Sequence, residues 1–371
     1  MMRFSCEKAL LTGALAVAGR TVAMKSAITA LEGIYISADQ ELTLTGYNLE
    51  TGITVKIPAQ IQQTGNCVFP ARLFAEIVRK LPDDIVNISV DETLHVSIQC
   101  GISSFQIAAE SGEDYPELPE VESSSSITMP QSALRKLISG TIFSVSENMA
   151  RPIHTGCLIE AEGDTVTMVA VDGFRLAKRT YHSETAAAQS LKFVVPAAAL
   201  REVEKILADT DEPVRIYMGS KHILFAIGDA TLISRILEGE FLDWRRVVPK
   251  NNSILLTANV PTLTASIERV SLIVSEKIKS PVHCKFSENI ADFKTATTIG
   301  SAHDICPIAG DGKELEIGFN CRYLLDALKA IGCEEVTLEL SNGLSPIVMT
   351  PVDDTADFAY MVLPVRLKAG E

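Results

Sequence analysis

Three segments of the chain share one pattern of apolar positions: residues 68–81, 194–207 and 318–331. In each, an extended apolar pair precedes a helix-start residue, which is Pro70, Pro196 or Asn320, and apolar side chains then recur at spacings of three and four. That spacing places the apolar side chains on one face of an α-helix. Each segment therefore predicts a strand that runs into a short amphipathic helix.

A second set of helical patterns lies upstream of these segments, each behind a β-prone lead-in: residues 6–20, 131–148 and 261–279. The intervening stretches alternate apolar and polar residues or are rich in β-branched residues, as in residues 41–48, 165–172 and 336–343. Such runs, separated by turn signals, are typical of antiparallel strands. The sequence thus predicts two helices and several strands in each of three copies.

The copies recur at a period of about 125 residues, which is the size of a domain rather than of a solenoid repeat. Residues 113–126 are acidic, contain proline and end in serines, which suits an exposed connection, and residues 247–253 have a similar role. We therefore expect an α+β fold of three repeated domains, each with two helices packed on antiparallel sheet: residues 1–122, 123–250 and 251–371.

Charge separates the predicted helices from the rest of the chain. The net charge of the 371 residues is -14, which argues against a simple basic nucleic-acid binder, because sequence-independent affinity for DNA comes from cations that neutralise phosphates. The predicted helices cover six windows: 6–20, 70–81, 131–148, 196–207, 261–279 and 320–331. These windows nevertheless carry 14 Lys or Arg against 8 Asp or Glu. This asymmetry is expected of a protein whose helices face a polyanion.

Several classes of protein are excluded by what the sequence lacks. No uninterrupted apolar stretch reaches the roughly 18 residues of a membrane span, and no cleavage site follows a long apolar run at the N-terminus. We therefore expect a cytoplasmic protein without a membrane partner. The eight cysteines are scattered and form no C-x-x-C pair, so we expect no disulfide framework, no metal site and no cofactor.

No set of residues in the sequence indicates catalysis. The chain lacks the phosphate-binding loop, the dinucleotide-binding motif, the nucleophile elbow and the zinc-protease motif, and its six histidines are isolated from one another. Asp172 is followed by glycine, a pair that more often forms a tight turn than a catalytic site. We predict no catalytic residues. Two alternatives remain open at this point: a triplicated α+β enzyme that acts on a small acidic ligand, and a protein-binding scaffold without DNA.

Four motifs, in their order along the chain, carry a resemblance to a known family: VDGFRLA at 171–177, EFLDWRRVVPK at 240–250, GFNCRYLLDAL at 318–328 and MVLPVRL at 361–367. Together with the repeat, they make the chain resemble the bacterial DNA polymerase III beta subunit, or beta sliding clamp, from about Phe4 to Leu367. The resemblance implies a head-to-tail homodimer whose six domains close a ring around double-stranded DNA without reading its sequence. It also implies a nucleoid-associated replication processivity factor that is not itself a catalyst, although the family is grouped with the DNA-directed DNA polymerases, which are nucleotidyltransferases.

The resemblance further implies which residues bind partners. A pocket between the second and third domains would capture short peptides of the replicative polymerase alpha subunit, the clamp loader and repair proteins, and it would be lined by Val171, Gly173, Phe174, Arg175, Leu176, Leu242, Val247, Tyr323, Leu344, Met361, Leu363, Pro364, Val365 and Arg366. The candidate DNA contacts are Lys25, Arg72, Lys80, Arg135, Asn148, Arg151 and Lys277. The candidate dimer contacts are Phe105 and Ile107 in the first domain and Leu272 and Ile273 in the third.

Overall fold

The structure is a computed structural model that describes residues 1–122, 125–183, 190–274, 280–353 and 355–367. The described chain forms two compact units, one from residues 1–134 with 201–236 and the other from residues 135–200 with those from Leu237 onward. Every paired strand in the described sheets is antiparallel. The predicted α+β class is confirmed.

The first unit contains two sheets. In the order of hydrogen-bonded neighbours, the five-stranded sheet consists of β5 (Gln60–Gln63), β1 (Met2–Glu7), β7 (Ile85–Val90), β8 (His95–Cys100) and β9 (Ser103–Ala108). The nine-stranded sheet consists of β10 (Glu110–Ser111), β6 (Gly65–Pro70), β2 (Gly33–Ala38), β3 (Leu42–Tyr47), β4 (Thr51–Ile57), β18 (Ala230–Arg235), β17 (His222–Ile227), β16 (Pro213–Met218) and β11 (Ser126–Pro130).

The second unit is built on one ten-stranded sheet. Its strands, in the same kind of order, are β15 (Leu191–Pro196), β12 (Gly156–Glu162), β13 (Thr165–Val171), β14 (Arg175–His182), β24 (Phe358–Val362), β23 (Ile347–Pro351), β22 (Glu335–Leu340), β19 (Ile254–Asn259), β21 (Gly300–Phe319) and β20 (Val282–Thr297). The predicted strands at 41–48, 165–172 and 336–343 correspond to β3, β13 and β22.

Two strand pairs carry the sheets across the predicted domain boundaries. Strand β4 pairs with β18, and β14 pairs with β24, so backbone hydrogen bonds run without interruption from one predicted domain into the next. Strand edges that would otherwise face solvent are thereby covered. This continuity explains why the two compact units divide the chain through the middle domain, and the residue limits of the three domains stay a prediction.

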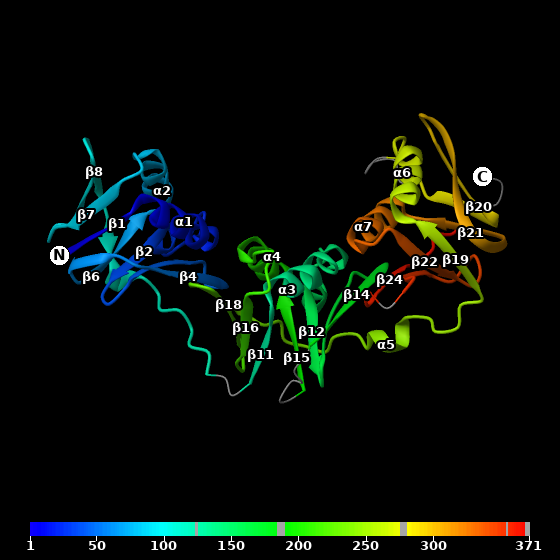
Figure 1. Cartoon of the computed structure of the whole chain (residues 1–371), viewed down its shortest axis with the longest axis horizontal. Coiled ribbons are helices and arrows are strands. Elements are labelled where there is room, and N and C mark those ends of the chain that lie inside the picture. Colours follow the sequence, from blue (N-terminus) through cyan, green and yellow to red (C-terminus); the bar gives the residue numbers. More distant parts are fainter. Residues whose placement is uncertain (123–124, 184–189, 275–279, 354, 368–371) are drawn as a thin grey trace. The chain divides into compact units, whose positions relative to one another are not determined.

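Each predicted domain carries two of the main helices in the described part of the chain, as expected. These helices are α1 (Lys8–Ala18), α2 (Ala71–Lys80), α3 (Gln131–Ser139), α4 (Ala197–Ile206), α6 (Val260–Ser271) and α7 (Cys321–Ile331), and a single helical turn, α5 (Trp244–Val247), was not predicted. In Figure 1, α1 lies beside α2 and α6 beside α7, and both pairs are in contact. Asn259 and Asn320 cap α6 and α7 by accepting hydrogen bonds from the N–H groups of Thr262 and Arg322.

Three predicted helix limits are wrong. Helix α1 begins at Lys8 rather than at Cys6, because Cys6 and Glu7 belong to β1 and pair with β7. Helix α3 ends at Ser139 rather than at residue 148, because the Thr141 hydroxyl donates to the Leu137 carbonyl at 2.8 Å and the chain then turns. Helix α6 ends at Ser271, and residues 275–279 of the predicted window lie outside the described chain.

The predicted exposed connection after the first domain is partly packed against that domain. Tyr115 is buried, its ring stacks on Tyr35 with centroids 5.1 Å apart, and its hydroxyl donates to the Thr45 carbonyl at 3.3 Å. An aromatic ring with a hydrogen-bonded hydroxyl can be buried at low cost, whereas the acidic residues around it cannot. The composition of the segment therefore predicts that its polar residues are exposed but does not predict that Tyr115 is buried.

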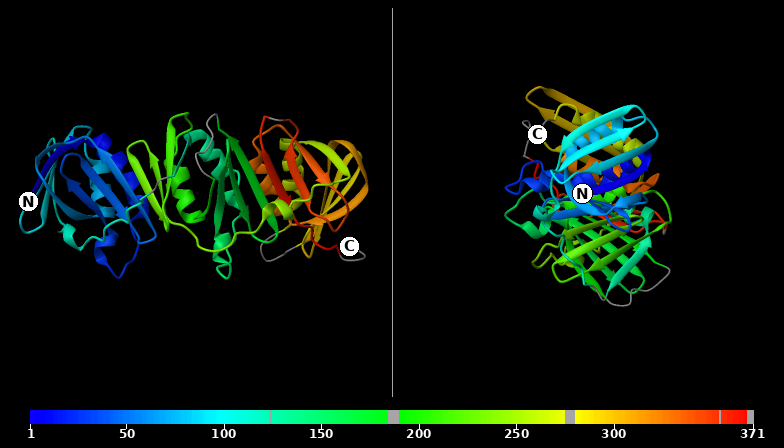
Figure 2. Two further views of the ribbon diagram at one scale, coloured as in Figure 1. Left: turned by 90° about the horizontal axis from the view of Figure 1, so that it is seen from below. Right: turned by 90° about the vertical axis from the view of Figure 1, so that its left-hand side faces the viewer.

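Strands β20 and β21 form the longest hairpin in the described structure and lie along α6 (Figures 1 and 2). Asp304 of β21 accepts hydrogen bonds from Ser266 at 2.8 Å and from the Arg269 guanidinium of α6. The Arg269 hydrogen bonds lower the pKa of Asp304 to about 2. The outer half of the hairpin is thereby fixed to the helix that precedes the candidate dimer residues.

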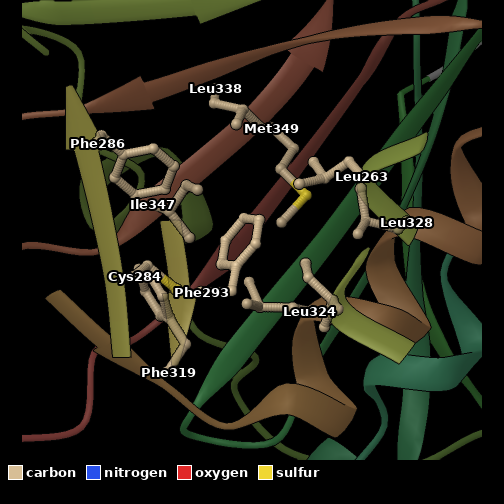
Figure 3. Close-up of a pocket in the computed structure, with 11 residues that line it drawn as sticks. Leu263, Cys284, Phe286, Phe293, Phe319, Leu324, Leu328, Leu338, Ile347 and Met349 are labelled. Carbon is tan, nitrogen blue, oxygen red and sulfur yellow. The ribbon is translucent and has the colours of Figure 1, made fainter. Parts of the chain in front are cut away.

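The core of the third predicted domain contains a void of about 10 Å³ (Figure 3). It is surrounded by apolar side chains of α6, α7 and the sheet, among them Leu263, Phe293, Phe319 and Leu328. A void of this size can hold at most about one water molecule, and apolar walls give that water no hydrogen-bond partner. We interpret the void as a packing defect and not as a ligand site.

Truncation of Phe293 should enlarge this void. Phe293 is buried and packs edge-to-face against Phe286. For Phe293→Ala we expect the free energy of unfolding to fall by about 3–5 kcal/mol, because the lost transfer energy adds to the energy of the cavity. Urea denaturation followed by circular dichroism measures this change, and Ile299→Ala, at an exposed position of the same hairpin, is the matched control.

Candidate functional site

The turn between β13 and β14 presents the first candidate pocket residues. The Asp172 carboxylate accepts hydrogen bonds from the N–H groups of Phe174 at 2.8 Å and Arg175 at 3.0 Å. Gly173 has a φ of 93°, a conformation that favours glycine. The tight turn predicted for Asp172 is present, and it leaves the Phe174 side chain 60% exposed.

Arg175 lies beneath this turn rather than on the surface. Its side chain is 9% exposed, and it donates to Asp172 at 2.9 Å and to Asp326 of α7 at 2.6 Å. The guanidinium carbon also lies 4.4 Å from the centroid of the Tyr323 ring. Two carboxylates and an aromatic face satisfy this buried cation, so Arg175 supports Tyr323 and the turn from within.

Phe174 and Tyr323 form an aromatic wall. Their ring centroids are 6.2 Å apart, the rings are inclined by 25°, and Phe174 is the more exposed of the two. Because Tyr323 in turn covers Arg175, the three side chains form one layered stack. A stack of this kind offers a large apolar face at a low cost in side-chain entropy.

Three further predicted pocket residues, Val171, Leu176 and Met361, are buried. They belong to one apolar cluster with Phe241 and Val348, and the partly buried Leu363 packs against it. Leu176 of β14 lies directly opposite Met361 of β24. The structure therefore brings together predicted pocket residues that lie about half the chain length apart.

The segment after β24 runs along the same wall. The Leu363 N–H donates to the Phe174 carbonyl, and the Val365 N–H donates to the Gly318 carbonyl, both at 2.8 Å. A Cβ at Gly318 would lie 2.8 Å from the Val365 carbonyl oxygen and 2.7 Å from Leu367, so only glycine permits this approach. Pro364 is half-buried, and Val365 and Arg366 are exposed.

Two predicted pocket residues are exposed near helix α5: Leu242 precedes the helix, and Val247 is its last residue. The partly buried Trp244 of α5 and Val248, which directly follows it, pack on the cluster that contains Met361. Leu344 is highly exposed in the turn after β22, and its place in the pocket stays a prediction. Sequence reasoning missed Trp244 and its partner Glu160, although a glutamate within the apolar run CLIEA of β12 was a signal that could have identified the latter.

The candidate DNA residues are exposed wherever the structure describes them. Arg72 and Lys80 lie on α2, and Arg135 lies on α3. Three more lie in loops: Lys25 after the first helix, and Asn148 and Arg151 after α3. Lys277 lies outside the described residues. Arg72 is 93% exposed and forms a loose ion pair with Glu76 at 3.5 Å. Such a pair contributes little, so the cation is free to neutralise a phosphate.

The candidate dimer residues lie on an edge strand and directly after a helix. Phe105 is exposed and Ile107 half-buried on β9, which is an edge strand of the five-stranded sheet. Leu272 directly follows α6 and is 82% exposed, and Ile273 beside it is half-buried. Exposed apolar side chains at a strand edge and at a helix end are typical of an interaction surface.

The remaining chemistry of the described residues gives no sign of a metal site, since none of them form a group of three or more His, Cys, Asp or Glu suited to a metal ion. The eight cysteines are free thiols, and burial raises the pKa of Cys6 and of Cys67 to about 12. A thiol that stays protonated at neutral pH is a poor nucleophile. No helix in the part of the chain that the structure describes is long and apolar enough to span a membrane.

Three repeated α+β domains, with sheets that continue from one domain into the next, define the clamp class of proteins. Family models for the N-terminal, central and C-terminal domains of the DNA polymerase III beta subunit match residues 2–119, 128–243 and 245–366. The chain belongs to the DNA polymerase III beta subunit family, whose members are the beta sliding clamps.

Individual relatives agree with this assignment. The chain is 31% identical to the beta sliding clamp of Staphylococcus epidermidis, over 99% of this chain and 100% of that protein. It is similar to a solved putative DNA polymerase III beta subunit of Eubacterium rectale (TM-score 0.94, 32% identity) and to the DNA polymerase sliding clamp of Bacillus subtilis (TM-score 0.93, 29% identity), covering 99% of this chain and 100% of each of those. The recognised family and the three-domain clamp fold are confirmed, and these relatives support a clamp rather than an enzyme that acts on a small acidic ligand.

Proposed function

We propose that this protein is the replicative sliding clamp of a bacterium, a non-catalytic processivity factor that encircles duplex DNA and tethers a polymerase to it. The observation that carries the proposal is the match of all three domains, in order, to the beta subunit family. Topology then retains the protein on DNA, so strong binding is unnecessary. A few salt-sensitive contacts to phosphates permit sliding because they read no bases.

A head-to-tail homodimer would close the ring. Within one chain, each joint between domains is a pair of antiparallel strands, β4 with β18 and β14 with β24. Closure between chains would place the β9 edge, with Phe105 and Ile107, against the third domain of the other chain near Leu272 and Ile273. Two identical contacts of this type leave no interface unused, which is the condition for a closed ring.

Short peptides of the polymerase alpha subunit, the clamp loader and repair proteins would bind at the pocket. The layered stack of Phe174, Tyr323 and Arg175 provides an aromatic wall, and the apolar cluster that contains Met361 provides the floor. An apolar surface with a few satisfied polar groups suits a leucine or aromatic anchor. The grouping of the family with the nucleotidyltransferases would refer to the assembled polymerase. The clamp itself would act in the cytoplasm, at the nucleoid.

Sedimentation equilibrium at micromolar concentration, combined with a peptide titration, tests the proposal. We expect a species with twice the mass of one chain, and saturable binding of a fluorescein-labelled peptide that carries a leucine and a phenylalanine anchor. The same peptide with both anchors replaced by alanine is the control. Single chains at this concentration, or equal binding of both peptides, would contradict the proposal.

For the DNA surface we expect a small effect from one cation. Lys25→Ala should reduce the amount of clamp loaded on DNA about two- to threefold and should weaken its dependence on salt, because each phosphate contact contributes about one unit to the salt slope. Loading assays over a range of salt concentrations measure both quantities. Lys56→Ala is the matched control, since Lys56 is also exposed but lies on strand β4.

A further inference from the structure

Glu160 is a buried carboxylate in the middle of β12. It is 8% exposed, between the buried residues Ile159 and Ala161. Side chains alternate between the two faces of a strand, so Glu160 shares its face with Leu158, which belongs to the apolar cluster of the pocket floor. A charge in this position requires partners, because burial of an unpaired carboxylate is costly.

Three donors converge on this carboxylate. One oxygen accepts from the Trp244 indole N–H at 3.1 Å and pairs with the Arg245 guanidinium at 2.9 Å, and the other pairs with Lys192 at 3.2 Å. Lys192 is directly opposite Glu160 on β15. Burial by itself raises the pKa of Glu160, but the bonds from Trp244 and Lys192 and the charge of Arg245 outweigh it, so the pKa lies below its ordinary value.

The donors Trp244 and Arg245 begin α5, which is a single helical turn. A helix of four residues cannot hold its own conformation, so contacts with the rest of the protein must fix it. The Arg245 guanidinium lies 4.5 Å from the centroid of the Trp244 ring, and the indole packs on the apolar cluster. Leu242 and Val247, two residues before and three after Trp244, are therefore placed by the same contacts.

We propose that Glu160 is a positioning residue for the partner pocket: it holds α5 through Trp244 and Arg245 and thereby fixes the wall that carries Leu242 and Val247. Glu160 itself need not touch a bound peptide. This inference rests on the proposed function of the pocket. It adds a residue from β12, outside the motifs that identify the family.

A double-mutant cycle tests the inference. In Glu160→Gln the side chain keeps its size and one acceptor but loses its charge, and in Trp244→Phe the ring keeps its packing but loses its N–H. We expect each to weaken binding of the labelled leucine-phenylalanine peptide about fivefold, measured by fluorescence polarisation. The double variant should be no weaker than the stronger single one, because both changes remove the same contact.

Two further measurements separate positioning from a general loss of structure. Trp244 is the single tryptophan of the sequence, so its emission should shift to the red and its quenching by acrylamide should increase in Glu160→Gln. Glu162→Gln, at an exposed position of the same strand, should change neither emission nor binding. If Glu160→Gln does not fold, Arg245→Gln removes one of the same contacts from a half-exposed side chain and should act in the same direction.

Unchanged peptide affinity in the folded Glu160→Gln or Arg245→Gln variant would overturn the inference. A double variant whose loss of peptide affinity equals the product of the two single losses would also overturn it. Failure of the proposed function has a different signature. In that case the wild-type protein itself would not bind the peptide, while the tryptophan emission would still differ between wild type and Glu160→Gln.

Discussion

A variant in which Leu272 and Ile273 are both replaced by alanine should sediment as single chains and should not be retained on circular DNA. Each side chain that is buried in the interface contributes about 1–3 kcal/mol, and a head-to-tail ring contains the interface twice. Leu272 is 82% exposed in the single chain, so its removal costs the fold little. Sedimentation velocity at micromolar concentration measures the outcome.

Leu255→Ala is the matched control for this experiment. Leu255 is also an exposed leucine of the third domain, but it lies on β19, which precedes α6 in the chain. The control should remain dimeric, and circular dichroism should show the same helix and strand content in both proteins. A Leu272 and Ile273 double variant that stays dimeric would contradict the proposed interface.

Deletion of residues 364–371 should reduce capture of the labelled peptide at least tenfold. The MVLPVRL motif begins at Met361, but Met361 and Val362 are buried within β24 and pair with β14 and β23, so the deletion begins after them. A cut before Pro364 spares that strand and removes the segment that Val365 fastens to Gly318. Loss of one pocket wall is expected to cost about 1.4 kcal/mol or more, which is a factor of ten.

Removal of the last four residues, 368–371, alone is the control for this deletion. These residues extend beyond the MVLPVRL motif, and their loss should leave peptide affinity unchanged. Fluorescence polarisation measures both proteins under the same conditions. Undiminished capture by the protein that ends at Leu363 would refute the role of the C-terminal segment.

The periodic elements could be predicted from the sequence to within about a residue where local chemistry defines them. Helices α2, α4 and α7 follow Pro70, Pro196 and Asn320 as expected, because proline and asparagine at these positions favour helix starts. The end of α3 could not be predicted, since the apolar spacing continues past Ser139 while the Thr141 hydroxyl satisfies the last carbonyls and turns the chain.

The candidate site divides in a similar way. The turn at Asp172 and the identity of the pocket segments follow from motifs, because a turn is a local structure. The burial of Arg175 beneath Tyr323 and the bond between Glu160 and Trp244 join residues far apart in the chain, and no local pattern encodes them. The charge pattern likewise predicts that cations lie on the helices. It does not predict that Arg72 is almost fully exposed, because exposure depends on how the helix packs.

The closed ring is tested most directly by the topology of the DNA. The protein is loaded by a clamp loader onto a nicked circle, free protein is removed, and half of the sample is cut once with a restriction enzyme. We expect the protein to stay on the circle and to be lost from the free ends of the linear molecule. Equal retention on both forms would show ordinary binding to DNA and would rule out a closed ring.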